Sequence, residues 1–233
     1  VVSAKDLKGY RIEQETEASG KYLVYISPTS FYCKSAAFGF TIFAVAPKWT
    51  VTAFRDDSRS WVQTSLSEFL KSDFLFMNRL NYSADLQTPT KSVEIQREGH
   101  RTIVYNFPPV DNQDGNLFAY DREEDRKARR GKLTPVLTSL VTGYPQTTSS
   151  LANKLYEINP QLKGLPINIS ITDAQGKLKL SLHTIKISRD VLFSEGLMTV
   201  PKGYRQGIFN KKFFISKSQN EFMHEMYNGM MAP

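Results

Sequence analysis

The sequence predicts a mostly β protein of the α+β class, in which two or three helices cover an antiparallel sheet. Short runs rich in aromatic and β-branched residues recur along the chain, as half-buried strands favour. Apolar and polar residues alternate on both sides of a glycine-containing turn at 173–176. Two segments, near 66–79 and 147–158, change to the spacing of an amphipathic helix.

Residues 9–63 form the first group of predicted strands, a meander interrupted by turn residues. Its strand candidates are 11–15, 22–26, 31–33, 40–45, 49–54 and 61–63. The single cysteine, Cys33, lies in one of these runs. We therefore expect a buried, inert thiol, and one cysteine allows no intrachain disulfide.

The first helix is predicted to begin after Ser65 or Ser67, either of which can cap it, with Glu68 near its first turn. Its apolar stripe consists of Leu66, Phe69, Leu70, Phe74, Met77 and Leu80. A stripe this rich in Phe and Met can line a ligand cavity, or it can simply plug the sheet. Both interpretations remain open from the sequence.

The middle of the chain predicts a second hairpin over 93–105, a solvated loop at 111–115 and a strand at 117–120. The following segment, 121–130, mixes acids and bases, which is typical of solvated surface. The helix at 147–158 has candidate caps among residues 147–150, and Leu151, Leu155 and Ile158 line one face.

The strongest hairpin signal spans residues 167–187. Isoleucines alternate with polar residues before the turn, and leucines alternate with polar residues after it. This alternation predicts that Ile169 and Leu180 both point to the covered face. Short extended pieces follow at 190–193 and 200–204, and a Phe/Met-rich C-terminal extension at about 207–233 can carry a last helix. We expect residues 1–233 to form a single domain.

Composition limits the function classes. Of 233 residues, 40% are hydrophobic, which is enough for a real core, and the net charge is +7 with a pI near 9.3. Because the basic residues are spread along the chain, we expect no nucleic-acid partner. His100, His183 and His224 lie far apart, so no metal site is predicted. Phosphate-loop, HExxH and GxSxG motifs are absent, and we predict no cofactor and no catalytic residues.

Several short segments resemble a family of exported bacterial proteins. They are Tyr25-Ile26-Ser27-Pro28, Ala46-Pro47-Lys48-Trp49-Thr50-Val51, Gly164-Leu165-Pro166-Ile167, the hairpin through Lys186, and Phe193 followed by Val200-Pro201-Lys202-Gly203-Tyr204. In these segments the chain resembles proteins with the LolA-like fold, related to the outer-membrane lipoprotein carrier. The resemblance implies a strongly curved antiparallel sheet, an incomplete barrel, wrapped over helices. It also implies an extracytoplasmic location, periplasmic or secreted, with a signal peptide removed before Val1.

The same resemblance implies a binding or carrier protein that holds a lipid-like or other hydrophobic ligand in its half-barrel. The implied partners are a lipid or an acylated protein, together with peripheral contact with an anionic membrane. A curved sheet cannot follow a helix everywhere, so we expect a ligand site between the sheet and the first helix. Its predicted ligand-binding residues are Phe69, Phe74 and Met77 on one wall, with Tyr25 and Phe43 opposite.

Two other functions remain open. The first is a small-molecule enzyme on the same scaffold, in which Tyr25, Tyr32, Tyr105 or His183 transfers protons or orients a substrate. The second is an envelope assembly or interaction protein that uses its exposed edges or its tail. A co-purifying lipid would favour the binding protein over both.

Overall fold

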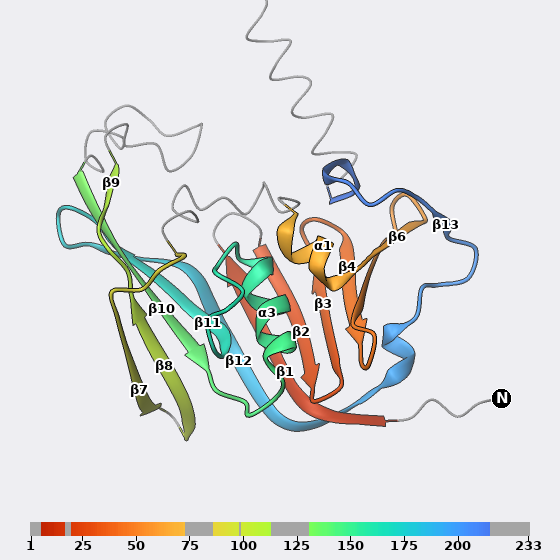
Figure 1. The fold of residues 1–233 in the computed structure, drawn as a ribbon, viewed down its shortest axis with the longest axis horizontal. Coiled ribbons are helices and arrows are strands. Elements are labelled where there is room, and N and C mark those ends of the chain that lie inside the picture. Colours follow the sequence, from red (N-terminus) through yellow and green to blue (C-terminus); the bar gives the residue numbers. More distant parts are fainter. Residues whose placement is uncertain (1–5, 17–19, 73–85, 98, 113–130, 215–233) are drawn as a thin grey trace, which may run out of the picture.

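The computed structural model describes residues 6–16, 20–72, 86–97, 99–112 and 131–214. Over these ranges the chain is mostly β, with one large, open, curved sheet and few helices (Figure 1). The strand order is β13-β6-β5-β4-β3-β2-β1-β12-β11-β10-β8-β7, and β9 pairs with β10 beside this path. Since the described strands at the two ends, β13 and β7, do not pair with each other, the sheet is not closed into a barrel.

The first six strands confirm the predicted meander over residues 9–63. Each pairs antiparallel with the next one along the chain. They are β1 (Asp6–Thr16), β2 (Gly20–Ser27), β3 (Ser30–Ser35), β4 (Phe40–Val45), β5 (Thr50–Arg55) and β6 (Ser60–Thr64).

The remaining long strands build the other half of the sheet. They are β7 (Lys91–Arg97), β8 (His100–Asn106), β9 (Val110–Asn112), β10 (Gly131–Leu140), β11 (Leu165–Thr172) and β12 (Leu178–Ser194). The hairpin of β7 and β8 confirms the prediction for 93–105. The predicted loop at 111–115 is wrong at its start, because Asp111 and Asn112 pair with β10. The predicted strand at 117–120 and the charged segment at 121–130 lie outside the described residues.

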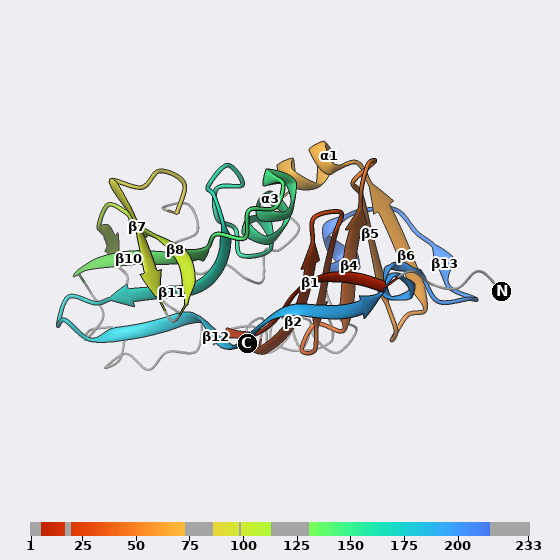
Figure 2. The same ribbon diagram turned by 90° about the horizontal axis from the view of Figure 1, so that it is seen from below.

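Strand β12 joins the two halves of the sheet. It is 17 residues long, and its first part pairs with β11 while most of its length pairs with β1. Figure 2 shows the sheet rising on either side of α3 (Gln146–Leu155), with β12 running beneath. The helices therefore lie on the side toward which the sheet curves, as the sequence predicts.

Helix α1 (Leu66–Lys71) begins as predicted but is shorter. The Ser65 hydroxyl accepts a hydrogen bond from the Glu68 backbone N–H, and the Glu68 carboxylate accepts one from the Ser65 backbone N–H, which makes a capping box. Ser72 has extended backbone angles, and its hydroxyl donates to the Phe69 carbonyl at 2.7 Å, which ends the helix. The predicted continuation to residue 79 falls on residues 73–85, which lie outside the described residues.

Helix α3 confirms the predicted helix near 147–158, but not its capping. Its N-cap residue is Pro145, which has no side-chain hydrogen bond to the helix. Thr148 Oγ1 instead donates to the Pro145 carbonyl at 2.7 Å, so a cap among residues 147–150 is wrong. The predicted apolar face is confirmed, since Leu151, Leu155 and Ile158 are all buried.

The chain after β12 differs from the prediction. Residues 200–204 were expected to be extended sheet, but the structure has a 3-10 turn at Glu195–Met198 and irregular backbone up to β13 (Arg205–Gln206). Strand β13 pairs parallel with β6, so the sheet is not wholly antiparallel. A second 3-10 turn spans Lys211–Phe214. The predicted helix of the C-terminal extension falls on residues 215–233, outside the described residues.

Both faces of the first half of the sheet are buried, because side chains alternate between faces along each strand. The main core lies on the helix-covered face and includes Val24, Cys33 and Ile42. A second cluster lies on the other face and joins Tyr32, Phe43 and Phe54 of the sheet with Phe193 and Met198. Segment 193–204 thus covers the face that the helices leave open.

Cys33 is fully buried, as predicted, and burial raises the pKa of its thiol far above the ordinary value. The thiol is therefore kept protonated and unreactive.

The 173–176 turn is confirmed, but the phase predicted for the strand after it is wrong. The Gly176 N–H donates to the Asp173 carbonyl at 3.0 Å, which closes the turn between β11 and β12. Ile169 is buried, whereas Leu180 is 43% exposed and Leu182 is buried instead. A bulge between Ile169 and Ser170 places Leu182 opposite Ile169 and Leu180 opposite Ser170, so the apolar phase shifts.

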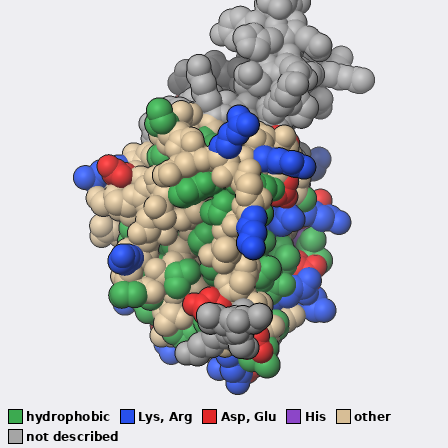
Figure 3. Space-filling model, turned by 90° about the vertical axis from the view of Figure 1, so that its right-hand side faces the viewer, with side chains coloured by type: hydrophobic (Ala, Val, Ile, Leu, Met, Phe, Trp, Pro, Cys, Tyr) green, Lys and Arg blue, Asp and Glu red, His purple; other side chains and the backbone are tan. Residues whose placement is uncertain are grey.

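The surface carries its positive charge in separate places. Figure 3 shows one end of the molecule, where Lys and Arg side chains are scattered and interspersed with hydrophobic and acidic ones. On this face they form no continuous basic patch. Among the described residues, no helix is both long and apolar enough to cross a membrane.

Candidate functional site

Among the predicted ligand-binding residues that the structure describes, Phe69 lies apart from Tyr25 and Phe43. Phe69 is fully buried in the core on the helix-covered face. Tyr25 and Phe43 belong to the cluster on the opposite face of the sheet. Their strand neighbours Val24 and Ile42 point to the helix-covered face, and side chains alternate between faces along a strand. The predicted cavity between Phe69 and these two side chains is therefore wrong. Phe74 and Met77 lie outside the described residues.

These three aromatic residues pack against other rings. The Phe69 ring lies 6.5 Å from that of Phe209. The Tyr25 ring lies 5.8 Å from that of Tyr32 and 5.0 Å from that of Phe193. Such distances are those of favourable aromatic pairs in a packed interior. For Phe69, Tyr25 and Phe43, large side chains therefore fill the space against the sheet, which is the second of the two interpretations that the sequence left open.

A different opening exists where β11 and β12 separate. Their ladder runs from Thr172 opposite Leu178 to Asn168 opposite His183. Beyond this point, the start of β11 pairs with β10, and the rest of β12 pairs with β1. Among the described strands, no ladder joins residues 165–167 to residues 184–187, so the sheet forks.

A buried polar bridge crosses the fork. Gln14 Nε2 on β1 donates to the Pro166 carbonyl at 2.7 Å and to Thr184 Oγ1 at 3.1 Å. Thr184 Oγ1 donates to the Ile167 carbonyl at 2.5 Å, and the hydroxyl of Tyr156, the C-cap residue of α3, donates to Gln14 Oε1 at 2.7 Å. Buried carbonyls need a partner, and these bonds replace the missing ladder. The fork is therefore stabilised by specific side chains.

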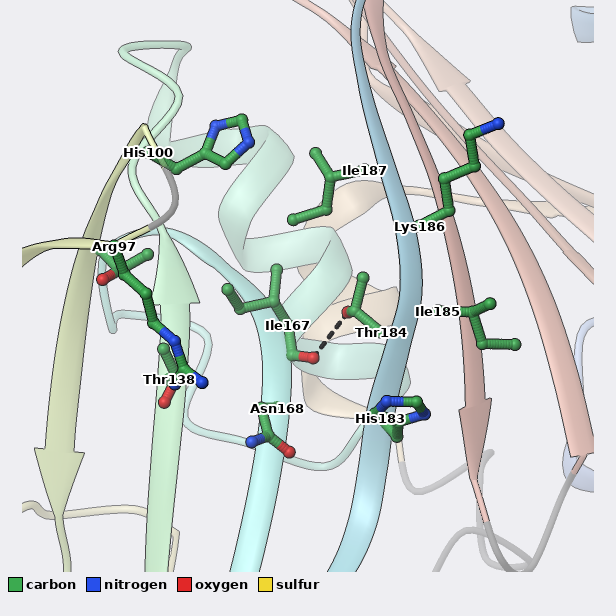
Figure 4. Close-up of a pocket in the computed structure, with 11 residues that line it drawn as sticks. Arg97, His100, Thr138, Ile167, Asn168, His183, Thr184, Ile185, Lys186 and Ile187 are labelled. Atoms are coloured by element: carbon green, nitrogen blue, oxygen red, sulfur yellow. Dashed lines mark hydrogen bonds between the residues drawn. The ribbon is translucent and has the colours of Figure 1, made fainter.

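A groove of about 310 Å³ lies along this fork. Its lining comes from β7, β8, β10, β11 and β12, and we call it the fork groove. Ile167, Ile185 and Ile187 are its apolar residues. Figure 4 shows Ile167 near the middle of the view, with Ile187 above it and Ile185 directed away to the side.

A row of polar side chains crosses the fork groove from strand to strand. Thr138 on β10 lies opposite Asn168 on β11, and Asn168 lies opposite His183 on β12. Directly opposite residues have Cβ atoms about 4.5–5.5 Å apart, so the three form a continuous strip. Asn168 Oδ1 is buried and has no hydrogen-bond partner among the described residues.

A second polar pair lies at the other wall. Arg97 and His100 are opposite each other at the end of the β7–β8 hairpin, and both line the groove. In Figure 4 the His100 ring is directed toward Ile187, and the Arg97 side chain runs down toward Thr138. The Lys186 side chain points away from the groove in the same view.

The fork groove is lined by basic, hydroxyl, amide and aliphatic side chains. Its lining, within the described part of the chain, includes two histidines, an arginine and a lysine, but no Asp, Glu, Ser or Cys. Of the four residues considered for an enzyme, only His183 lines it. Tyr25 and Tyr32 lie in the cluster on the far face, and the Tyr105 hydroxyl donates to the Lys163 carbonyl at 3.1 Å. The hydroxyl side chains of the groove are those of Thr102, Thr138 and Thr184.

Sequence reasoning missed Asn168 and the Arg97–His100 pair as site residues, and it named His183 only for the enzyme alternative. Asn168 is the polar member of an alternating run, and His183 belongs to the next strand of the hairpin. Their opposition depends on the register of that hairpin, which contains a bulge. A polar residue facing another across a predicted hairpin was the available signal, but the alternation alone does not show that Asn168 faces His183.

Neither a cluster of metal ligands among the described residues nor a known family assigns a function to the fork groove. Among the described residues, no group of three or more His, Cys, Asp or Glu side chains could hold a metal ion. No family model and no curated protein matches the chain. One similar solved structure is that of an uncharacterized conserved protein from Thermus thermophilus, with 11% identity and a TM-score of 0.40. The match covers 86% of this chain and 90% of that one.

Proposed function

We propose that the protein is a non-enzymatic binding or carrier protein that holds a lipid-like or other hydrophobic ligand in the fork groove. The observation that carries this proposal is the fork itself, because it opens the sheet at a place where a continuous ladder would leave no room. A volume of about 310 Å³ is at the lower end of the range, about 300–1,000 Å³, of small-molecule sites.

The apolar part of the groove suits an alkyl chain. Ile167 and Ile187 are half-buried side chains that also pack against the main core, so a ligand lying on them extends that core. Each buried methylene group contributes about 0.8 kcal/mol. A chain of several methylenes can therefore bind through apolar burial alone.

The LolA-like half-barrel and the extracytoplasmic location belong to the same proposal. The open curved sheet with helices on its curved-in side supports the fold, and the short segments that resemble the exported family support the location. The proposed partners remain a lipid or an acylated protein, with peripheral contact with an anionic membrane. The proposed ligand site is the fork between β11 and β12, and not the space beside α1 that the sequence predicts.

A fluorescent fatty-acid probe tests the proposal directly. We expect saturable binding to the wild type and weak or no binding to Ile167→Trp, because the indole fills the groove. The matched control is Leu192→Trp on β12, at a side chain that is 65% exposed and does not line the groove. Equal binding by all three proteins, with unchanged thermal stability, would place any ligand elsewhere. Native mass spectrometry of protein from its own host should show a co-purifying lipid.

A further inference from the structure

The polar lining of the fork groove has a charge bias that a purely apolar ligand would not need. Arg97 and Lys186 are its charged side chains, His100 and His183 add two imidazole rings, and no carboxylate lines the groove within the described residues. On β1, Glu13 and Glu15 lie opposite Lys186 and His183. These glutamates lie on the far side of β12.

The basic groups differ in where their side chains lie. Glu13 already pairs with Arg11 at 2.7 Å, and Lys186 points away from the groove. Arg97 and His100 form the opposite wall, with Thr138 and Asn168 between the two walls. A guanidinium group and neighbouring amide and hydroxyl donors are the groups that proteins use to hold a carboxylate or phosphate.

Asn168 provides an independent observation. Its Oδ1 atom is buried without a partner among the described residues. Asn168 also lines the groove, and its NH₂ group can donate a hydrogen bond to an anion held between Arg97 and His183.

We propose that the fork groove binds an anionic amphiphile, with its carboxylate or phosphate head between Arg97, His100 and the Thr138–Asn168–His183 row, and its alkyl chain along Ile167 and Ile187. This inference rests on the proposed function, since it names the ligand class of the same groove. The head group supplies specificity and the chain supplies apolar burial.

Ligands that share a ten-carbon chain test the head group. Decanoate, decyl phosphate, 1-decanol and decyltrimethylammonium are titrated below their micelle concentrations, with acetate and inorganic phosphate as heads without a chain. We expect decanoate or decyl phosphate to bind at least tenfold more tightly than decanol and the cation, and acetate and phosphate to bind much more weakly. Whichever of the two anionic ligands binds more tightly identifies the head.

Two variants locate the effect. Arg97→Gln should weaken binding of the preferred anionic ligand by about 10- to 100-fold, as expected for loss of a charged hydrogen bond. Its control, Arg101→Gln on the same hairpin, is an exposed residue paired with Glu94 and outside the groove, and should bind normally. Asn168→Leu should weaken binding of that anion without lowering Tm, because it removes a buried polar group that has no partner.

The outcomes separate the two proposals. Equal affinity for decanoate, decyl phosphate and decanol overturns the anionic head but leaves a hydrophobic ligand in the groove. Acetate or phosphate binding as tightly as the ten-carbon anion overturns the amphiphile and the proposed carrier function. If no ten-carbon compound binds, both proposals are overturned. A loss of Tm in Asn168→Leu assigns that side chain to stability and contradicts its role in binding.

Discussion

Gln14 is the residue on which the fork between β11 and β12 depends. Its side chain is 2% exposed, donates two hydrogen bonds across the fork and accepts one from Tyr156. Burial raises the pKa of Tyr156 well above its ordinary value, so the phenol remains a donor. Replacing Gln14 therefore removes the partner of the Pro166 carbonyl on β11 and of the Tyr156 hydroxyl at the C-cap of α3, while Thr184 on β12 keeps its bond to β11.

The substitution Gln14→Leu should lower the free energy of unfolding by about 1–3 kcal/mol or more, because a buried donor or acceptor without a partner costs that much. Urea denaturation measures the change. The control is Gln63→Leu, since Gln63 is exposed and donates to Thr52 at 3.2 Å; we expect a change within about 0.5 kcal/mol. Similar stability of the two variants would mean that the bridge across the fork is not structural.

Strand β12 shows how one bulge changes what an element buries. Three leucines at alternate positions, Leu178, Leu180 and Leu182, predict one common face. Because Ser181 is the extra residue at the bulge, Leu182 enters the core while Leu178 and Leu180 remain exposed. The apolar pattern identified the strand correctly but assigned its faces incorrectly.

A matched pair of charge substitutions tests this phase. Leu182→Asp should lower the free energy of unfolding by more than about 4 kcal/mol, since it places an unpaired charge in the core. Leu180→Asp, at a side chain that is 43% exposed, should change it by less than about 1 kcal/mol. Thermal melts of both proteins measure the difference. Unfolding of the Leu180 variant alone would restore the phase that the alternation predicts.

The sequence predicted elements better than it predicted how they combine. The meander over 9–63, the hairpin over 93–105, the capped start of α1 and the position of α3 follow from local spacing, and the structure confirms them. Whether Tyr25 meets Phe69 depends on which face of β2 the helices cover. The two side chains lie on opposite faces of the sheet. The fork depends on Gln14 reaching Pro166, 152 residues away. Local patterns carry no information about such a contact.

At the scale of the whole molecule, the two halves of the sheet depend on each other. Strand β12 pairs with β1 on one side and β11 on the other, and the main core runs from Val62 in β6 to Tyr105 in β8. Helix α3 packs on β11 and on β3, so it contacts both halves. We therefore expect one cooperative unfolding transition, as for a single domain.

The positions of the tryptophans allow a direct test of that cooperativity. Trp49 and Trp61, the only two in the chain, both lie in the β5–β6 region, so their fluorescence reports on the first half of the sheet. Leu137 is fully buried in β10, in the other half. Leu137→Ala should lower Tm by about 5 to 15 °C, as expected for truncation of a buried leucine.

If the core is shared, the Tm from tryptophan fluorescence and the Tm from far-UV circular dichroism should fall together in Leu137→Ala. The control Leu178→Ala, at a side chain that is 61% exposed, should leave both almost unchanged. A fluorescence transition that stays at the wild-type temperature while the dichroism transition falls would show two independent cores. In that case β12 would be a connection between two domains. The fork groove would then lie at their boundary, because its lining comes from β7, β8, β10, β11 and β12, whereas the polar bridge across the fork begins on β1.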